Sequence, residues 1–464
     1  MASKVDWSTL QGYKKDKPPD NDNQALSSCL TDFTVTIEAS CPTGFEVALQ
    51  NEIKEKSPSS TTVKHQGRIF FDIPVSKIRS VLELKCVDNA YIVIGKRTDF
   101  DFSGDIDTCL TRINELLETD NYDQELLPLA WDKGIIAWNE IFEFKKSGKE
   151  NWQECLSLLN NCQRIQDPSS NEDHVKKPKF NDAEQNEDKS EPETMTRPKF
   201  RATCYRSGQN CHSFQSTDVA RSFGGAINEK FGWGVSMKEF DIEVVITIDL
   251  AQIYVGIGLT KKSLFRRNIK HFGPTTLRAT ICASMLQLAD IQPGDIVVDP
   301  MCGGGSIPIE GALSYQKGFH LAGDNHEKAI YRATENFKAL SESLTEASGN
   351  EICKNLKADV LSWDVTRIPL RDNSVDVFIT DLPFGKRSGS KADNRVLYPK
   401  IMNSMARVVK ANTGRAVLLT QDKNSMFKSF GKFNKFWKIN RQYYCNIGGL
   451  SALVYIMSRT QTVP

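Results

Sequence analysis

The chain has 464 residues, long enough for roughly two to four domains, and carries 39% hydrophobic and 25% charged side chains with a net charge of +1. Its apolar runs are too short to span a bilayer, and no secretory or transit peptide is evident at its start. We therefore expect a cytoplasmic protein, possible also in the nucleus. Because the charge is nearly balanced, any nucleic-acid binding must come from local basic clusters.

The twelve cysteines are scattered singly, without a C-x-x-C pair. This spacing predicts packed, reduced thiols and argues against a zinc ribbon or a disulfide framework. The histidines show no metal-ligand spacing with each other or with cysteine, so we assign no metal.

Two segments, residues 1–30 and 166–198, are charged and poor in aliphatic side chains, which predicts disorder because they cannot bury enough surface to offset chain entropy. Residues 31–120 follow a β-α-β-α-β pattern, which predicts an α+β module of ferredoxin-like type. Its expected elements are a strand over 33–40, a helix over 41–56, a strand over 67–73, a helix over 75–85 and a strand over 90–96.

A second α+β module is predicted on both sides of the 166–198 insert. Its first part covers residues 121–165 and its second part residues 199–262. The second part shows a strand pattern, then a helix over 217–233 capped by Thr217 or Asp218, and then a hairpin over 241–260. The insert is therefore expected inside a domain.

From residue 263 to 464 the pattern changes to continuous apolar strands that alternate with helices. Such strands are typical of a parallel sheet covered on both faces, so we predict a doubly wound, Rossmann-like α/β domain. The predicted strands lie in "DIVVDP" (295–300), "HLAGDN" (320–325), "ADVLSWD" (358–364), "SVDVFITDLP" (374–383) and "GRAVLLTQD" (414–422).

Four of these strands end in polar residues, at the edge where such folds bind ligands. Asp299 is followed by the glycines 303–305, Asp324 comes about twenty residues after them, Asp364 ends the third strand, and "DLPFG" (381–385) ends the fourth. Each acid alone is as readily a helix cap, and a glycine turn alone is a weak signal. Four such polar strand ends, in order in one sheet, predict a nucleotide-like ligand.

"DLPFG" is the most informative of these motifs. A carboxylate and a proline-constrained carbonyl can both accept from an exocyclic amine, while the aromatic ring stacks on a base. The motif therefore indicates a site for a nucleobase amino group. By itself, it would be a proline turn with a core phenylalanine.

Together, "DPMCGGGSIPIEG", "AGDN" and "DLPFG" resemble the motifs of class I S-adenosylmethionine-dependent amino-methyltransferases. The resemblance implies a seven-stranded, mostly parallel sheet with one antiparallel strand, and "YYCNIGGLSALVYIM" (443–457) fits the last hairpin. Residues 264–289 resemble the joint between an RNA-binding THUMP module and such a domain in tRNA guanine-N2-methyltransferases, which act on the acceptor stem. The two N-terminal modules would then be ferredoxin-like and THUMP modules.

The resemblance also implies a role for individual residues. The methionine part of S-adenosyl-L-methionine would lie against Asp299, Cys302, Gly303 and Gly305, with Pro274 and Thr275 nearby. The ribose would lie against Asp324 and Asn325, and the adenine against Asp364 and Val365. The guanine, next to the cofactor, would lie against Asp381, Leu382, Pro383 and Phe384. Gly304 departs from the family pattern, where a small hydroxyl residue is usual. In this mechanism Asp381 and the carbonyl of Leu382 or Pro383 accept hydrogen bonds from the amine.

The segment "KKSLFRRNIKH" (261–271) is dense in basic side chains. A charge run is usually a solvated face, but its place before the catalytic domain favours contact with RNA phosphates. The candidate RNA-binding residues are Arg68, Lys261, Lys262, Arg266, Arg267, Lys270, Lys386, Arg387 and Lys391. The resemblance further implies a small zinc-binding activator subunit (Trm112-like) as a partner.

The expected function is methylation of a guanosine amine in the tRNA acceptor stem, giving N2-methylguanosine of the position 6 type. Two alternatives remain open: an adenine-N6 methyltransferase acting on RNA or DNA, because the same motif accepts that amine, and a catalytically silent RNA-binding protein. A nicotinamide-dependent dehydrogenase is disfavoured because the turn lacks G-x-G-x-x-G spacing.

Overall fold

The structure, a computed structural model, describes residues 33–117, 131–142, 197–207, 212–348, 356–385 and 390–462. The predicted tail, most of the predicted insert and most of 121–165 lie outside these residues. The described chain divides into two compact units, one formed by Thr36–Ala90 with Thr260–Pro464 and the other by Tyr91–Leu259. Within these ranges, no helix has the length and apolarity needed to cross a membrane.

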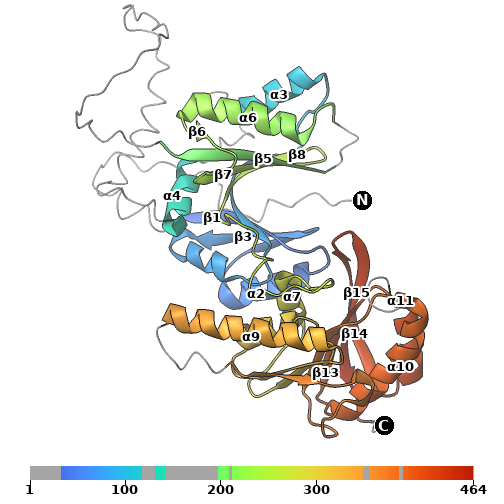
Figure 1. The fold of residues 1–464 in the computed structure, drawn as a ribbon. Coiled ribbons are helices and arrows are strands. Elements are labelled where there is room, and N and C mark those ends of the chain that lie inside the picture. The colour runs from blue at the N-terminus through green and yellow to red at the C-terminus, as the bar shows by residue number, and fades with distance from the viewer. Residues whose placement is uncertain are drawn as a thin grey trace, which may run out of the picture. The chain divides into compact units, whose positions relative to one another are not determined.

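A seven-stranded sheet organises the C-terminal part of the first unit (Figure 1). Its strands lie in the order β11-β10-β9-β12-β13-β15-β14; the first five are parallel, and β15 is antiparallel to both of its neighbours. Their bounds are β9 (Ile296–Asp299), β10 (Phe319–Asp324), β11 (Ala358–Ser362), β12 (Val377–Asp381), β13 (Arg415–Thr420), β14 (Trp437–Ile447) and β15 (Leu450–Arg459). The predicted doubly wound fold with one antiparallel strand is confirmed.

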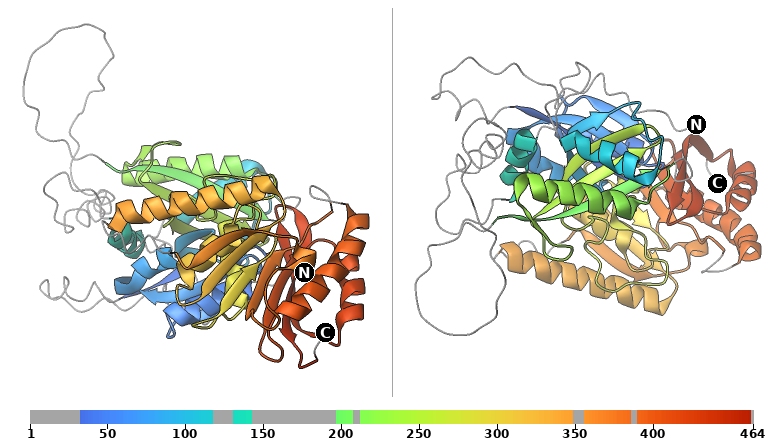
Figure 2. Two further views of the ribbon diagram at one scale, coloured as in Figure 1. Left: turned by 60° about the horizontal axis from the view of Figure 1, so that its bottom comes forward. Right: turned by 90° about the horizontal axis from the view of Figure 1, so that it is seen from above.

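Helices cover both faces of this sheet (Figures 1 and 2). Along β12, Val377 and Ile379 face the cluster that contains α7, whereas Phe378 between them faces the cluster that contains α10. This alternation follows from the two-residue period of a strand and makes the first three positions of β12 apolar. The helices are α7 (Ala279–Leu288), α8 (Ser306–Ser314), α9 (Glu327–Ser348), α10 (Lys391–Val408) and α11 (Lys423–Phe433), with the 3₁₀ turn η7 (Val365–Arg367).

The N-terminal part of the first unit contains three strands in the order β2-β3-β1. The helix predicted over 75–85 is instead a 3₁₀ run, because its buried residues Val75, Ile78 and Val81 recur every three positions, the period of a 3₁₀ helix. The elements here are β1 (Thr34–Ser40), α2 (Glu46–Lys56), β2 (Thr62–His65), β3 (Arg68–Pro74) and η2 (Val75–Glu83).

This N-terminal part packs directly on the helices of the seven-stranded sheet. Phe45 is fully buried in the same cluster as residues of α7, and the Thr280 hydroxyl on α7 donates to Asp88 Oδ1 at 2.7 Å. The Arg267 guanidinium bridges Lys85 O at 2.7 Å and Glu310 Oε2 on α8 at 2.8 Å. These contacts explain why the two stretches form one compact unit.

The second unit contains strands in the order β4-β8-β7-β5-β6, with α3 and α6 packed together on one side (Figure 1). The helix predicted over 217–233 is confirmed, but its N-cap is Gln215 and not Thr217 or Asp218; the Asp218 carboxylate accepts from the Gln215 N–H at 2.8 Å. The elements are β4 (Asn89–Arg97), α3 (Ile106–Asn114), η3 (Glu115–Leu117), α4 (Trp131–Phe142), β5 (Lys199–Ser207), α6 (Ser216–Phe231), β6 (Gly234–Val235), β7 (Ile242–Asp249) and β8 (Gln252–Gly258).

The predicted module boundaries at residues 120 and 262 differ in place from the edges of the compact units, which fall after Ala90 and after Leu259. The assignment of these parts to ferredoxin-like and THUMP modules stays a prediction. The expected hairpin over 241–260 is present as the antiparallel pair β7 and β8.

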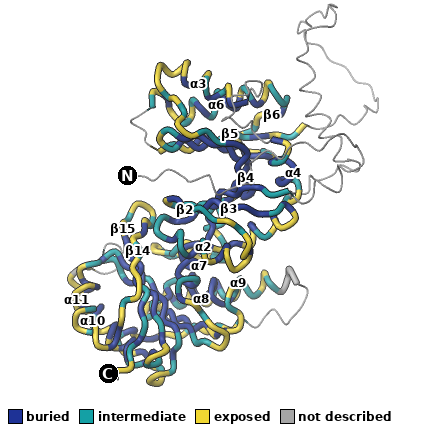
Figure 3. Tube along the Cα trace, turned by 180° about the vertical axis from the view of Figure 1, so that it is seen from behind, coloured by how far each residue is buried: buried dark blue, intermediate teal, exposed yellow. Residues whose placement is uncertain are grey.

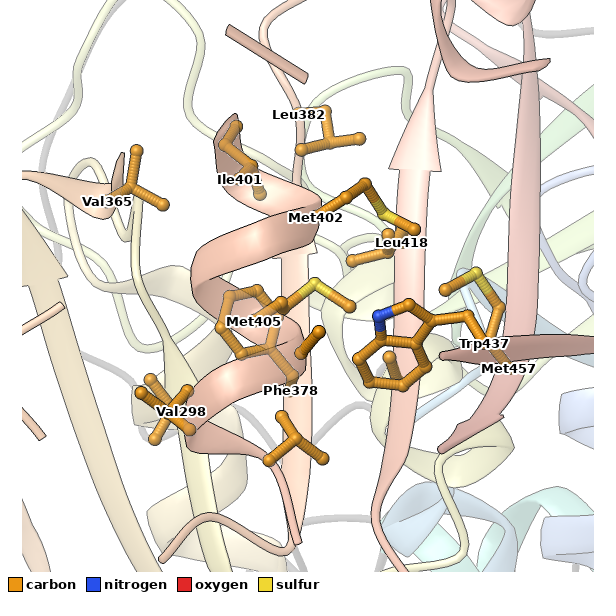
Figure 4. Close-up of a cluster of buried hydrophobic side chains, with 14 of the residues drawn as sticks. Val298, Val365, Phe378, Leu382, Ile401, Met402, Met405, Leu418, Trp437 and Met457 are labelled. Carbon is orange, nitrogen blue, oxygen red and sulfur yellow. The ribbon is translucent and has the colours of Figure 1, made fainter. Parts of the chain in front are cut away.

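Burial follows this architecture (Figure 3): the sheet strands β9, β12 and β13 are almost wholly buried, whereas α9 keeps many exposed residues. The cluster on the α10 side includes Trp437, which is 0% exposed, together with Met457, Met405 and Phe378 (Figure 4).

We predict that Trp437→Ala lowers the free energy of unfolding by about 3–5 kcal/mol, because it removes a fully buried ring and leaves a cavity. Urea unfolding followed by circular dichroism measures the change. The matched control is Phe427→Ala on α11, where the ring is 78% exposed and the expected change is within about 0.5 kcal/mol. Equal losses in the two variants would contradict this description of the core.

Candidate active site

The carboxylates of three neighbouring strands gather at one edge of the sheet. Asp324, Asp299 and Asp381 are the last residues of β10, β9 and β12, which are adjacent and parallel. Asp299 is 3% exposed, and the other two are half-buried. The sequence predicted this convergence. The three acids therefore lie where an open α/β sheet binds its ligand.

The glycine turn after β9 is held against the end of β10. Gly303 and Gly305 have φ values of +57° and +83°, a left-handed conformation that favours glycine. The Gly303 N–H donates to Asp324 Oδ2 at 3.0 Å, and the Cys302 N–H donates to Gly323 O at 2.8 Å. A Cβ built on Gly303 would meet no atom within 4 Å, so the turn borders open space.

Burial changes the acid chemistry of this edge. It raises the pKa of Asp299 from 3.8 to about 7, against the opposing hydrogen bond from the Met301 N–H at 3.2 Å. Burial, followed by the nearby charge of Asp299, also raises the pKa of Asp381 well above its usual range. Carboxyl groups with raised pKa values are typical of functional sites.

Two residues that the sequence analysis missed hold the turn in place. Asn336 on α9 is 1% exposed; its Oδ1 accepts from His271 N at 2.8 Å, and its Nδ2 donates to His271 O at 3.0 Å and Gly304 O at 2.9 Å. Buried Trp363 donates to Pro300 O at 3.1 Å. A buried Asn within a helix pattern was the available signal for the first.

Gly304, the predicted departure from the family pattern, accepts one of these hydrogen bonds from Asn336 through its carbonyl. A Cβ there would be 3.5 Å from His271 O and 3.6 Å from Asn336 Nδ2, which are ordinary van der Waals contacts. A small side chain would therefore fit without moving the turn, so glycine is not required by space at this position.

These residues fit the predicted cofactor, S-adenosyl-L-methionine. The glycine turn leaves room beside its main chain, and both β9 and β10 end in an acid. Asp364 is exposed after β11 and accepts from Thr366 N at 2.8 Å, while Val365 next to it is buried. The other predicted cofactor residues, Pro274, Thr275 and Asn325, lie exposed in loops.

The predicted RNA-binding residues with described side chains divide into two groups. Arg267 pairs with Glu310 and is 17% exposed, and Arg68 pairs with Glu38 at 2.7 Å, so both side chains are engaged in ion pairs within the fold. The exposed members are Lys261, Lys262, Arg266 and Lys270. Lys386, Arg387 and the side chain of Lys391 lie outside the described residues. In the described part of the chain, no group of three His, Cys, Asp or Glu side chains is arranged to hold a metal ion.

We predict that Asp299 makes stability depend on pH. The unfolded chain ionises this carboxyl near pH 3.8 and the folded chain near about 7, so folding takes up a proton between these values. The free energy of unfolding should therefore fall as the pH rises through this window and level off above it. Asp299→Asn mimics the protonated carboxyl, so its melting temperature should exceed that of the wild type at about pH 8.

Thermal melts of both proteins from about pH 5 to pH 8 test this expectation, and the advantage of Asp299→Asn should shrink toward the acid end. Asp359→Asn, at an exposed position of β11, controls for the loss of a surface carboxylate. A melting-temperature difference between Asp299→Asn and the wild type that does not vary with pH would contradict the prediction.

Comparison with known proteins agrees with this site. Residues 266–451 match the family described as RMKL-like, methyltransferase domain. The tRNA (guanine(6)-N(2))-methyltransferase THUMP3 of Bos taurus is 38% identical over 462 residues, covering 92% of this chain and 88% of that protein.

Two crystal structures share the fold. TrmN from Thermus thermophilus covers 92% of this chain and 99% of its own, with a TM-score of 0.62 and 19% identity. SMU.472 complexed with SAH covers 93% of this chain and 99% of its own, with a TM-score of 0.59 and 15% identity. The fold class is thereby confirmed, and the identity to the bovine protein across most of both sequences shows that the chain belongs to the family of THUMP3 tRNA (guanine(6)-N(2))-methyltransferases.

Proposed function

We propose that this chain methylates the exocyclic amine of a guanosine in the tRNA acceptor stem and forms N2-methylguanosine of the position 6 type. The observation that carries the proposal is the carboxylate of Asp381 at the end of β12, followed by a Leu-Pro-Phe turn and adjacent to the glycine turn. The name of the bovine relative supports the same reaction.

S-adenosyl-L-methionine, when bound, supplies a methyl group that is already activated as a sulfonium. The chain's own residues then have to orient the amine, whose lone pair is delocalised into the guanine ring. Asp381 and a carbonyl of Leu382 or Pro383 accept from its two N–H groups, which favours pyramidalisation and directs the lone pair outward. Because its pKa is raised, Asp381 is also suited to take the amine's proton.

Phe384 supports the base in this proposal. Its ring is half-buried and packs against the cluster on the α7 side, so one part of it is anchored and another remains accessible. A guanine that has left its stack would find an aromatic surface there. The Asp381–Phe384 turn therefore provides both hydrogen-bond acceptors and a stacking surface.

The exposed basic side chains before α7 are the proposed phosphate contacts. Lys262, Arg266 and Lys270 are exposed, and the main chain at Lys270 and His271 is tied by Asn336 to the glycine turn. A phosphate bound by these side chains would be held at a constant distance from the reacting edge. Such contacts position RNA without reading its sequence.

For the small zinc-binding activator subunit, we propose the edge strand β11 as the docking place. Among the described strands, β11 pairs with β10 alone, and its Leu361 is 39% exposed. Phe337, Leu356 and Val360 line a groove of about 320 Å³ beside it. A subunit that adds a strand here would satisfy the open edge and cover these apolar side chains.

The reaction is tested with unmodified tRNA, labelled S-adenosyl-L-methionine and the purified chain, with and without the activator subunit. We expect N2-methylguanosine by mass spectrometry, and a loss of at least about 100-fold in Asp381→Asn, because a neutral amide replaces the carboxylate that accepts the amine's hydrogen bond and its proton. Asp372→Asn, where the side chain is 67% exposed on the loop before β12, should keep its activity.

Labelled adenosine in place of guanosine would instead identify an adenine-N6 methyltransferase. If neither base is labelled although S-adenosylhomocysteine still binds, the chain is a silent RNA-binding protein. Wild-type activity in Asp381→Asn would sink the assigned role of Asp381.

The phosphate contacts are tested by the salt dependence of tRNA binding. The double variant Arg266→Ala, Lys270→Ala should bind tRNA more weakly and lower the slope of log Kd against log salt by about 1 for each lost contact. The matched control is Lys317→Ala, which removes an exposed lysine between α8 and β10, at the opposite edge of the sheet. An unchanged slope in the double variant would remove this segment from the RNA interface.

A further inference from the structure

We infer that Tyr398 and Asn394 are positioning residues for methyl transfer, which act through the carbonyl of Pro383 and leave the Leu382 carbonyl as the second acceptor for the guanine amine. This inference rests on the proposed function. It begins from the observation that two buried side chains of α10 converge on one carbonyl in the middle of the Asp381–Phe384 turn.

The two contacts are close, and both donor side chains are buried. The Tyr398 hydroxyl donates to Pro383 O at 2.7 Å, and Asn394 Nδ2 donates to the same oxygen at 2.9 Å. The two residues are 1% and 0% exposed, and as positions i and i+4 they lie on the same face of the helix. Burying two polar groups at one point of a helix is costly unless both are hydrogen-bonded.

The hydrogen bond from Tyr398 to Pro383 O is the last in a chain of hydrogen bonds that all point in the same direction. Since the single hydroxyl proton of Tyr398 is used on Pro383 O, the 2.8 Å contact between Tyr398 and Thr420 must have the threonine as donor. Thr420 Oγ1 accepts in turn from Asp422 N at 2.9 Å. Bonds aligned in one direction polarise one another, so the chain strengthens the last bond, on Pro383.

The orientation of the Asn394 amide is equally defined. Its Nδ2 lies 2.9 Å from Pro383 O and 3.2 Å from Asp422 Oδ2. Both of these atoms are acceptors, so turning the amide over would place three oxygens together. Asp422 also accepts from Ser425 N at 3.1 Å at the start of α11, which ties the turn to two helices and the end of β13.

This arrangement decides between the two carbonyls left open above. A carbonyl oxygen has two lone pairs, and both of those on Pro383 O are directed to protein donors. The amine of guanine therefore finds its acceptors at Asp381 and at the carbonyl of Leu382. The main chain of Leu382 is itself fixed by its N–H, which donates to Leu419 O at 2.8 Å.

Positioning of this kind affects the chemical step more than binding. Loss of the Tyr398 hydroxyl leaves Asn394 on Pro383 O, so the turn keeps its shape but gains freedom next to the two acceptors. Because in-line transfer is sensitive to small displacements of the nucleophile, the rate of transfer should fall while ligand affinities stay nearly unchanged.

The test is a series of variants assayed for N2-methylguanosine in single turnovers at saturating tRNA and cofactor, with the activator subunit present. We expect Tyr398→Phe to lower the rate constant about tenfold, with Kd for S-adenosylhomocysteine and for tRNA within about twofold of the wild type. Thr420→Val, which removes the donor to Tyr398, should lower the rate constant about threefold, and Thr420→Ser should restore it.

The matched control is Tyr455→Phe, which removes a hydroxyl from a buried tyrosine of the same domain outside this chain of hydrogen bonds. It should leave the rate constant unchanged. The inference is overturned if Tyr398→Phe transfers methyl groups at the wild-type rate, if its loss lies wholly in Kd, or if Tyr455→Phe loses as much. A wild type that forms no N2-methylguanosine overturns the proposed function itself, and this inference with it.

Discussion

Burial of the seven-stranded sheet on both faces is the constraint on which the rest of this structure depends. Successive residues of β12, such as Phe378 and Ile379, contribute to two different apolar clusters, so the middle of the strand is apolar on both faces. Polar groups are left to the strand ends and the loops that follow them. The acids, the glycine turn and the Leu-Pro-Phe turn all lie there, because that edge is the part of the sheet which helices do not cover.

The same burial gives the site its chemistry at a cost in stability. Asp299 and Asp381 end their strands close to the apolar interior, and desolvation raises the pKa of both. A solvated carboxyl would suit folding better, but it would be a weaker proton acceptor near neutral pH. The stability lost here is offset by the packing of large side chains such as Trp437 on the α10 side.

Buried polar side chains outside the motifs hold the reactive loops in shape. Asn336 joins the basic segment to the glycine turn, and Tyr398 with Asn394 holds the Pro383 carbonyl. Arg267 joins the N-terminal part to α8 through Glu310. Each tie connects segments far apart in the sequence, so the geometry of the site depends on the whole unit and not on the motifs alone.

Local patterns in the sequence determined the strands, their order of apolar and polar residues, and the acids at their ends, because strand period and turn chemistry are properties of neighbouring residues. They also carried the family resemblance. Only the tertiary structure decided that Arg267 serves an internal ion pair, that residues 75–83 form a 3₁₀ run, and that Pro383 O is already bonded. Such contacts join residues distant in sequence, and one sequence contains no signal for which buried donor meets which acceptor.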